Sequence, residues 1–256
     1  MYILGYIALF LASLISGLSL FFFEKKSKVL GFISVFGGAF LLAVCFVHLL
    51  PEAFALSSDS GCSHSHSHHH VHEHEHGFSF PLGGFVLFGF LLQLLLELVS
   101  KGAKHGPLHD EDECMSHGSY LTSLMILLGV SIHAFLEGFA LVTNGSMNYS
   151  LLIGVILHNI PISMVVMGSF LKAGCSKAVS LCHLAIFAAM GVAGSIVSLC
   201  FDFVTAYTAE IMCFVVGILL HVSISTLFDS TESHKYNFVR FVIVIAAFAT
   251  ACLLPH

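Results

Sequence analysis

Two histidines and a glutamate lie in strongly apolar sequence, where polar side chains are costly. His133 and Glu137 are four residues apart in SIHAFLEGFALV, and His158 follows in LLIGVILHNIPIS with Asn159 beside it. Residues four apart share one face of a helix. Imidazole and carboxylate groups are ligands that proteins offer to Zn²⁺ and related ions. The spacing therefore predicts a metal site made by His133, Glu137, His158 and Asn159.

The composition indicates that these residues lie inside a membrane. The chain of 256 residues is 57% hydrophobic and 9% charged, with a mean hydropathy of +0.95. A soluble domain carries about 25% charged residues. We therefore expect an all-α integral membrane protein. Ionisable side chains within spanning helices are costly and mark functional sites by default.

Eight apolar runs are long enough to cross the hydrocarbon core, which takes about 20 residues. They cover roughly 2–23, 29–55, 81–100, 120–143, 150–171, 178–200, 207–228 and 237–254, and together make a single transmembrane domain over 1–256. All nine lysine and arginine residues lie in or beside the connections that follow spans 1, 3, 5 and 7. The positive-inside rule then predicts that both termini are extracytoplasmic.

The predicted spans place the first three candidates at one depth. At about 1.5 Å per residue, His133 lies roughly 15 Å and Glu137 roughly 9 Å from the outer end of span 4, and His158 roughly 12 Å from that of span 5. The short connection makes these spans antiparallel neighbours, so the side chains should meet near mid-membrane. The alternative is that His133 and Glu137 only satisfy each other. That reading does not explain the depth of His158.

Other polar residues in the spans are weaker candidates. On span 2, His48 and Glu52 share a face and could guide metal or anchor the helix end. Exit-path ligands could come from His183 in span 6 and His221 in span 7. Gln93 and Glu97 on span 3 suggest a hydrogen bond within the bundle. The cysteines inside apolar runs, Cys45 among them, are interpreted as small packing residues.

Two connections are rich in metal-binding residue types. The extracytoplasmic loop 57–80 holds eight histidines, namely His64, His66, His68, His69, His70, His72, His74 and His76. The cytoplasmic loop 101–119 combines histidines with four acidic residues. Histidine tracts bind metals in many geometries. The alternatives are a disordered polar linker for the first loop and a solvated run of charge for the second.

The chain resembles the ZIP (Zrt/Irt-like) metal transporters, in a bacterial branch. The similarity rests on His133-x3-Glu137-Gly138, on His158-Asn159-Ile160-Pro161, on HLLPEAF in span 2 and on GILLHVSISTLFDSTESHKYN in and after span 7. It implies a three-plus-two-plus-three arrangement with an inverted repeat and a metal site between spans 4 and 5. It also implies metal movement toward the cytoplasm and, by analogy, an elevator-like motion of spans 1, 4, 5 and 6.

Two departures from the family pattern predict a site for one ion. Many relatives have polar residues where this chain has Ala134 and Ile162. We expect Zn²⁺ as transported substrate and not as cofactor, with Fe²⁺, Mn²⁺, Co²⁺ or Cd²⁺ also accepted. The expected location is the cell membrane. The expected partners are metal ions and the bilayer, with a homodimer as a further candidate and no nucleic acid.

Two other functions are weighed against uptake. A metal exporter of the cation diffusion facilitator type typically has six spans and a soluble metal-binding domain, and the sequence predicts neither. An intramembrane zinc hydrolase would need a bound water and a general base. The chain has no HExxH motif, and no second acid lies at the depth of Glu137. We therefore expect a transporter and not an enzyme.

Overall fold

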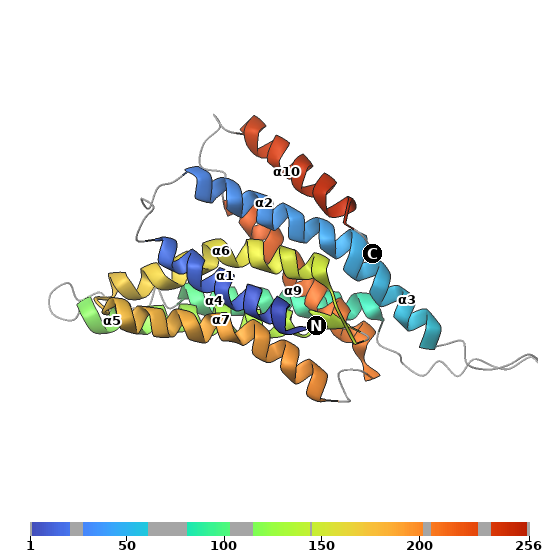
Figure 1. The fold of residues 1–256 in the computed structure, drawn as a ribbon, viewed down its shortest axis with the longest axis horizontal. Coiled ribbons are helices and arrows are strands. Elements are labelled where there is room, and N and C mark those ends of the chain that lie inside the picture. The colour runs from blue at the N-terminus through green and yellow to red at the C-terminus, as the bar shows by residue number, and fades with distance from the viewer. Residues whose placement is uncertain are drawn as a thin grey trace, which may run out of the picture.

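The computed structural model describes residues 2–20, 28–60, 81–102, 115–143, 145–201, 206–229 and 237–254. These ranges are helical apart from short turns and one hairpin (Figure 1). The helices are α1 (Tyr2–Ser19), α2 (Lys28–Val44), η1 (Cys45–Leu49), α3 (Leu50–Ser60), α4 (Leu82–Gly102), α5 (Met115–Gly138), α6 (Tyr149–Lys172), α7 (Lys177–Cys200), α9 (Thr208–Asp229) and α10 (Asn237–Cys252). The π-helical turn η1 joins α2 to α3 without a break.

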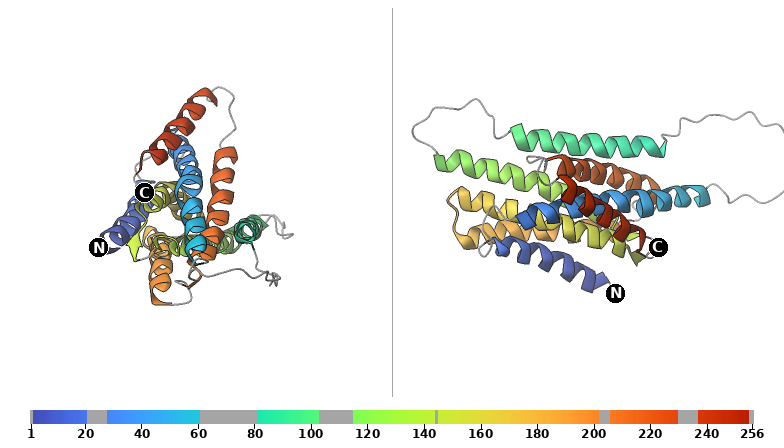
Figure 2. Two further views of the ribbon diagram at one scale, coloured as in Figure 1. Left: turned by 90° about the vertical axis from the view of Figure 1, so that its right-hand side faces the viewer. Right: turned by 90° about the horizontal axis from the view of Figure 1, so that it is seen from above.

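The helices confirm the prediction of an all-α membrane protein with about eight helices. Within the described ranges, six helical segments are long and apolar enough to cross a membrane, and α2, η1 and α3 together supply one of them. Two shorter apolar stretches are Leu82–Leu98 in α4 and Phe238–Cys252 in α10. The described chain begins and ends near the same end of the helices (Figure 2), as an even number of crossings requires.

The helices pack as two groups. In the first group, α1 packs on α6 and α7, and α7 packs on α5. In the second, α9 packs on α2, α3 and α4, and α10 packs on α2. The groups meet mainly where α2 lies along α6 and α4 lies along α5. The first group contains the four helices that correspond to predicted spans 1, 4, 5 and 6.

Close contacts inside each group depend on glycine. A Cβ atom on Gly194 of α7 would lie 1.9 Å from the Phe135 carbonyl oxygen of α5. A Cβ atom on Gly217 of α9 would lie 2.0 Å from the Val86 carbonyl oxygen of α4. Backbones can approach this closely only where no side chain intervenes. The close packing of α5 on α7 and of α4 on α9 therefore requires a residue without a side chain at Gly194 and at Gly217.

The outer end of predicted span 4 is wrong by five residues. Helix α5 ends at Gly138, and the chain then forms the hairpin β1 (Val142–Thr143) and β2 (Ser146–Met147). An Asn-Gly pair between short extended segments favours such a hairpin, and Gly145 has a φ of 71°. Hydropathy alone does not predict this turn, because Leu141, Val142 and Met147 are apolar and buried. Glu137 consequently lies in the last turn of α5 and not about 9 Å inside it.

Two other predicted boundaries shift at the loops. Helix α3 runs to Ser60 and α5 begins at Met115, so both take residues that the sequence assigned to the loops 57–80 and 101–119. Their ends are polar, and a hydropathy threshold stops short of them. The histidines from His64 to His76 lie outside the described residues, so their metal binding stays a prediction.

Candidate metal centre

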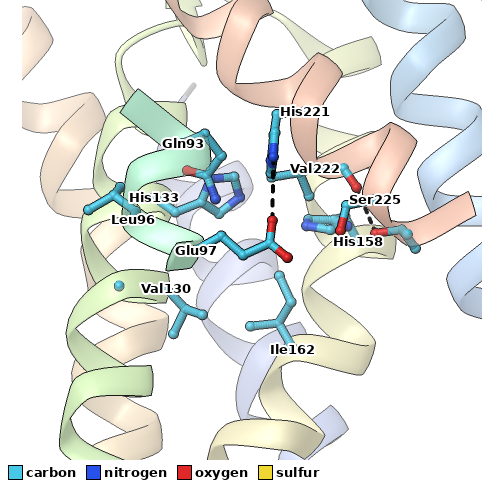
Figure 3. A pocket seen from close by; sticks show the side chains of 12 residues that line it. Gln93, Leu96, Glu97, Val130, His133, His158, Ile162, His221, Val222 and Ser225 are labelled. Atoms are coloured by element: carbon cyan, nitrogen blue, oxygen red, sulfur yellow. Dashed lines mark hydrogen bonds and ion pairs between the residues drawn. The ribbon is translucent and has the colours of Figure 1, made fainter. Parts of the chain in front are cut away.

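A cavity of about 200 Å³ lies between α4, α5, α6 and α9 (Figure 3). Its polar lining comprises Gln93, Glu97, His133, His158, His221, Ser225 and Thr226. Apolar side chains on the same wall include Leu96, Val130 and Ile162. From His158 the cavity extends along α6 to Ile162, toward the helix end that carries Lys172. Both helix groups therefore contribute polar residues to one space.

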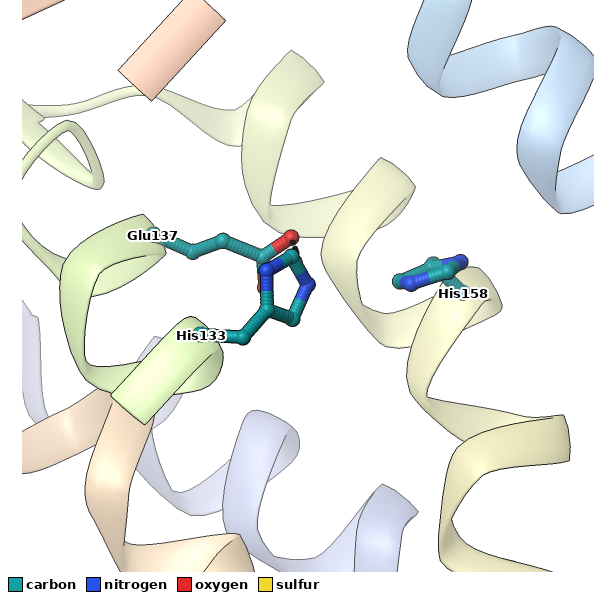
Figure 4. Close-up of side chains that lie close together, drawn as sticks. All are labelled: His133, Glu137 and His158. Carbon is teal, nitrogen blue, oxygen red and sulfur yellow. Dashed lines mark ion pairs between the residues drawn. The ribbon is translucent and has the colours of Figure 1, made fainter. Parts of the chain in front are cut away.

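His133 and His158 line this cavity, and Glu137 lies beside them (Figure 4). One ligand atom from each residue lies within 4.8 Å of the other two. His133 Nε2 is 2.9 Å from Glu137 Oε1, and the two imidazole centroids are 5.9 Å apart. These residues, which we call the triad, are 2%, 0% and 3% exposed. The predicted meeting of α5 and α6 side chains thus holds in the structure.

The local folding of α5 and α6 explains this placement. His133 and Glu137 are one turn apart on α5, which ends at Gly138 shortly before the hairpin. His158 lies on α6 just before Pro161. Proline has no N–H to donate to the carbonyl four residues earlier, that of Leu157. This carbonyl faces α2 at Gly37, where a Cβ atom would lie 3.3 Å from it.

The triad region contains buried polar atoms that have no hydrogen-bond partner among the described residues. Neither ring nitrogen of His158 has a hydrogen-bond partner among the described residues, and neither does Asn159 Oδ1. Asn159 is only 4% exposed, but it does not line the cavity. Buried polar side-chain atoms usually have a partner. Two imidazoles and one carboxylate within reach of one point could satisfy this need by binding a divalent ion.

Of the weaker candidates, His221 is the one that lines this cavity. Its Nε2 is 3.4 Å from Glu97 Oε2, across the α4–α9 contact. Both residues line the cavity with His133 and His158 (Figure 3). The sequence predicts only a hydrogen bond within the bundle for Glu97 and does not reveal its place in the cavity. The spacing of Gln93 and Glu97, one turn apart on α4, was the available signal.

The other weaker candidates lie apart from the triad. His48 Nε2 donates to the Ala251 carbonyl at 2.9 Å, which ties η1 to α10 and favours the anchoring alternative. Glu52 is half-buried one turn further along α3. His183 Nδ1 donates to the Val179 carbonyl at 2.8 Å, and its ring stacks on Phe170 with centroids 4.0 Å apart. These contacts use the rings of His48 and His183 for helix packing.

Comparison with known proteins supports the family resemblance. The family model described as ZIP Zinc transporter matches residues 1–120 and 104–254, which is nearly the whole chain. No curated protein matches the sequence closely enough to count as similar. This family match agrees with the helical membrane fold and with the buried triad. The chain belongs to the ZIP zinc transporter family and is a multi-pass membrane protein that transports divalent metal ions.

Proposed function

We propose that the protein takes up Zn²⁺ into the cytoplasm and that the triad of His133, Glu137 and His158 holds the ion in transit. The observation that carries this proposal is the meeting of three buried ligand groups from two helices within 4.8 Å. Burial of polar atoms without partners costs free energy. A divalent ion bound between them would remove that cost.

The proposed ligands can bind a divalent ion and also allow its release. Two imidazoles and one carboxylate fit Zn²⁺ and accept Cd²⁺, Co²⁺, Fe²⁺ or Mn²⁺. One carboxylate leaves a divalent ion with net positive charge, which favours release. Asn159 or water would complete the coordination. Ala134 and Ile162 offer no ligand for a second ion, so we propose one ion per protomer.

The cavity supports movement toward the cytoplasm. It extends from the two triad histidines to Glu97 and Thr226, which lie near the ends of α4 and α9. Basic connections follow these two helices, and the positive-inside rule assigns those connections to the cytoplasm. On the opposite side, the hairpin follows α5 directly and Glu137 is fully buried. We propose that this arrangement is an inward-open state, in a cell membrane and with extracytoplasmic termini. His221 and Glu97 would be the next polar groups that the ion meets.

Alternating access would move one helix group against the other. The triad belongs to the group of α1, α5, α6 and α7, whereas Glu97 and His221 belong to the other group. A displacement of the first group along α2 and α4 would carry the ion away from Glu97 and toward the outer side. Both groups keep their internal contacts in such a motion, because the glycine contacts at Gly194 and Gly217 lie within groups.

Metal flux into proteoliposomes tests the proposal. Purified full-length protein would be reconstituted, its orientation determined, and Zn²⁺, Cd²⁺, Co²⁺, Fe²⁺ and Mn²⁺ offered separately from each side. We expect saturable Zn²⁺ movement from the extracytoplasmic to the cytoplasmic face. Flux that runs only from the cytoplasmic face would reverse the direction, and an absence of flux for all five metals would refute transport through this chain.

The histidine-rich loop gives a separate prediction. Deletion of Gly61–Gly77 should lower uptake roughly 3-fold at low zinc concentration and leave the maximal rate intact, because a tethered capture site raises the local concentration of ion. A matched variant keeps the loop length and changes only the eight histidines to serine. If both variants give the uptake curve of the parent protein, the loop is a linker without a role in capture.

A further inference from the structure

Gln93 is a half-buried residue of α4 that the proposed ligand set leaves without a role. Its side chain points into the cavity between the two helix groups (Figure 3). The carbonyl oxygen Oε1 is shielded from solvent and has no hydrogen-bond partner among the described residues. A buried amide that lacks a partner costs free energy, and most such groups have one. This acceptor therefore indicates a contact that is made at one step of transport.

His133 has a matching donor on the facing wall of the cavity. Its Nε2 lies 2.9 Å from Glu137 Oε1, on the side where the two residues would share an ion. The other ring nitrogen, Nδ1, is buried without a hydrogen-bond partner among the described residues. A neutral imidazole that binds a metal through Nε2 carries its proton on Nδ1. Histidine ligands almost always donate this N–H to an oxygen acceptor, which fixes the ring and strengthens the ligand.

Helix packing brings Gln93 and His133 to one space. Both residues line the cavity of about 200 Å³, and α4 lies along α5 where the two helix groups meet. Figure 3 shows their side chains entering the cavity from these two helices. The carboxylate one turn further along α4, that of Glu97, is already engaged by His221 at 3.4 Å. Gln93 is thus the residue of the described part of α4 that offers His133 an unused acceptor.

We propose that Gln93 Oε1 accepts a hydrogen bond from His133 Nδ1–H while the triad holds the ion in the inward-open arrangement. The inference rests on the proposed function of the triad. Gln93 is then a positioning residue, because it acts on the ion through His133. It belongs to the helix group of α4 and α9, so a displacement of the triad along α4 breaks the hydrogen bond. Gln93 therefore strengthens ion binding from the cytoplasmic face and not from the outer face.

Substitution of Gln93 tests the inference in oriented proteoliposomes. Gln93→Leu removes the acceptor and should raise roughly 10-fold the cytoplasmic zinc concentration that halves net uptake. The half-saturating zinc concentration at the extracytoplasmic face should stay the same. Gln93→Glu keeps an acceptor and should hold the cytoplasmic value at or below that of the parent protein. Ser225→Ala removes a hydroxyl from the α9 wall of the same cavity and should change neither value. Equal shifts at both faces in Gln93→Leu, or no shift at either face, would overturn the inference.

Thermal unfolding of the metal-free protein separates positioning from structural support. Leucine in place of an amide without a partner should leave the unfolding temperature unchanged or raise it, because a desolvation cost is removed. A lower unfolding temperature in Gln93→Leu would mean that the amide supports the fold, which contradicts the inference. A failure of the triad is distinct, because zinc flux would then persist in His133→Ala. A failure at Gln93 alone would leave His133→Ala without flux and Gln93→Leu like the parent protein at both faces.

Discussion

Alanine at His133 or Glu137 should lower Zn²⁺ flux roughly 100-fold or more, since even changes next to metal ligands cost 10- to 100-fold. Each substitution leaves two of the three ligand groups that lie within 4.8 Å of one another. Removal of Glu137 has a further effect, because the triad then has no negative charge to offset the positive charge of the ion. Glu137→Gln separates these effects, since it keeps the shape of the side chain and removes its charge. The measurement is initial zinc flux in proteoliposomes at matched protein content.

His183→Ala is the control for the loss of an imidazole outside the triad, at a partly buried position. His183 belongs to the same helix group as the triad, and its Nδ1 bonds to the Val179 carbonyl while its ring stacks on Phe170. We expect zinc flux within roughly 3-fold of the parent protein, because the cost falls on packing and not on coordination. Equal losses in His133→Ala and His183→Ala would mean that the effect is structural. Full flux in His133→Ala would remove the triad from the transport path.

Gly194→Ala should destabilise the fold strongly, although it adds only one methyl group. The added Cβ would lie 1.9 Å from the Phe135 carbonyl oxygen and 3.3 Å from the Gly138 Cα atom, so α5 and α7 must separate. Overpacking of this kind costs about 3 kcal/mol when backbone atoms have to move. Because α5 carries His133 and Glu137, the shift should also lower zinc flux. Thermal unfolding in detergent, followed by size-exclusion chromatography, measures the loss.

Gly83→Ala is the control for this substitution. Gly83 lies in α4, and a Cβ atom there would meet nothing within 4 Å. Alanine has the higher helix propensity, so this variant should be as stable as the parent protein or slightly more stable. If Gly194→Ala unfolds at the same temperature as Gly83→Ala, the contact between α5 and α7 is looser than the structure has it. The assignment of α5 and α7 to one rigid group would then fail.

Much of the fold could be predicted because a bilayer imposes strong rules on sequence. Apolar runs of sufficient length locate the helices, and the polar connections separate them. The triad could be predicted for a related reason. Ionisable side chains are rare enough in lipid that His133, Glu137 and His158 stand out. Their meeting follows from the short connection between α5 and α6, which forces the two helices to lie side by side.

The remainder depends on contacts between helices that are distant in sequence. Glu97 meets His221 only because α4 packs on α9, and His48 meets the Ala251 carbonyl only because η1 lies beside α10. No pattern within one span reveals such pairs.

Short-range geometry explains the error at the end of α5. The residues after Gly138 are apolar enough to continue a span, yet the hairpin at Gly145 ends the helix. Glu137 therefore lies nearer the end of its helix than the span boundaries predict, yet it is fully buried. The three side chains meet all the same, because one turn of α5 still separates His133 from Glu137.

Zinc K-edge X-ray absorption on purified protein lacking Gly61–Gly77 tests the central claim most directly. The account predicts one tightly bound zinc per protomer, with a first shell that contains two imidazoles and oxygen from Glu137. In the His133→Ala variant of the same protein, this zinc should be lost or should show one imidazole fewer. A bound zinc whose spectrum is the same with and without His133 would contradict the account.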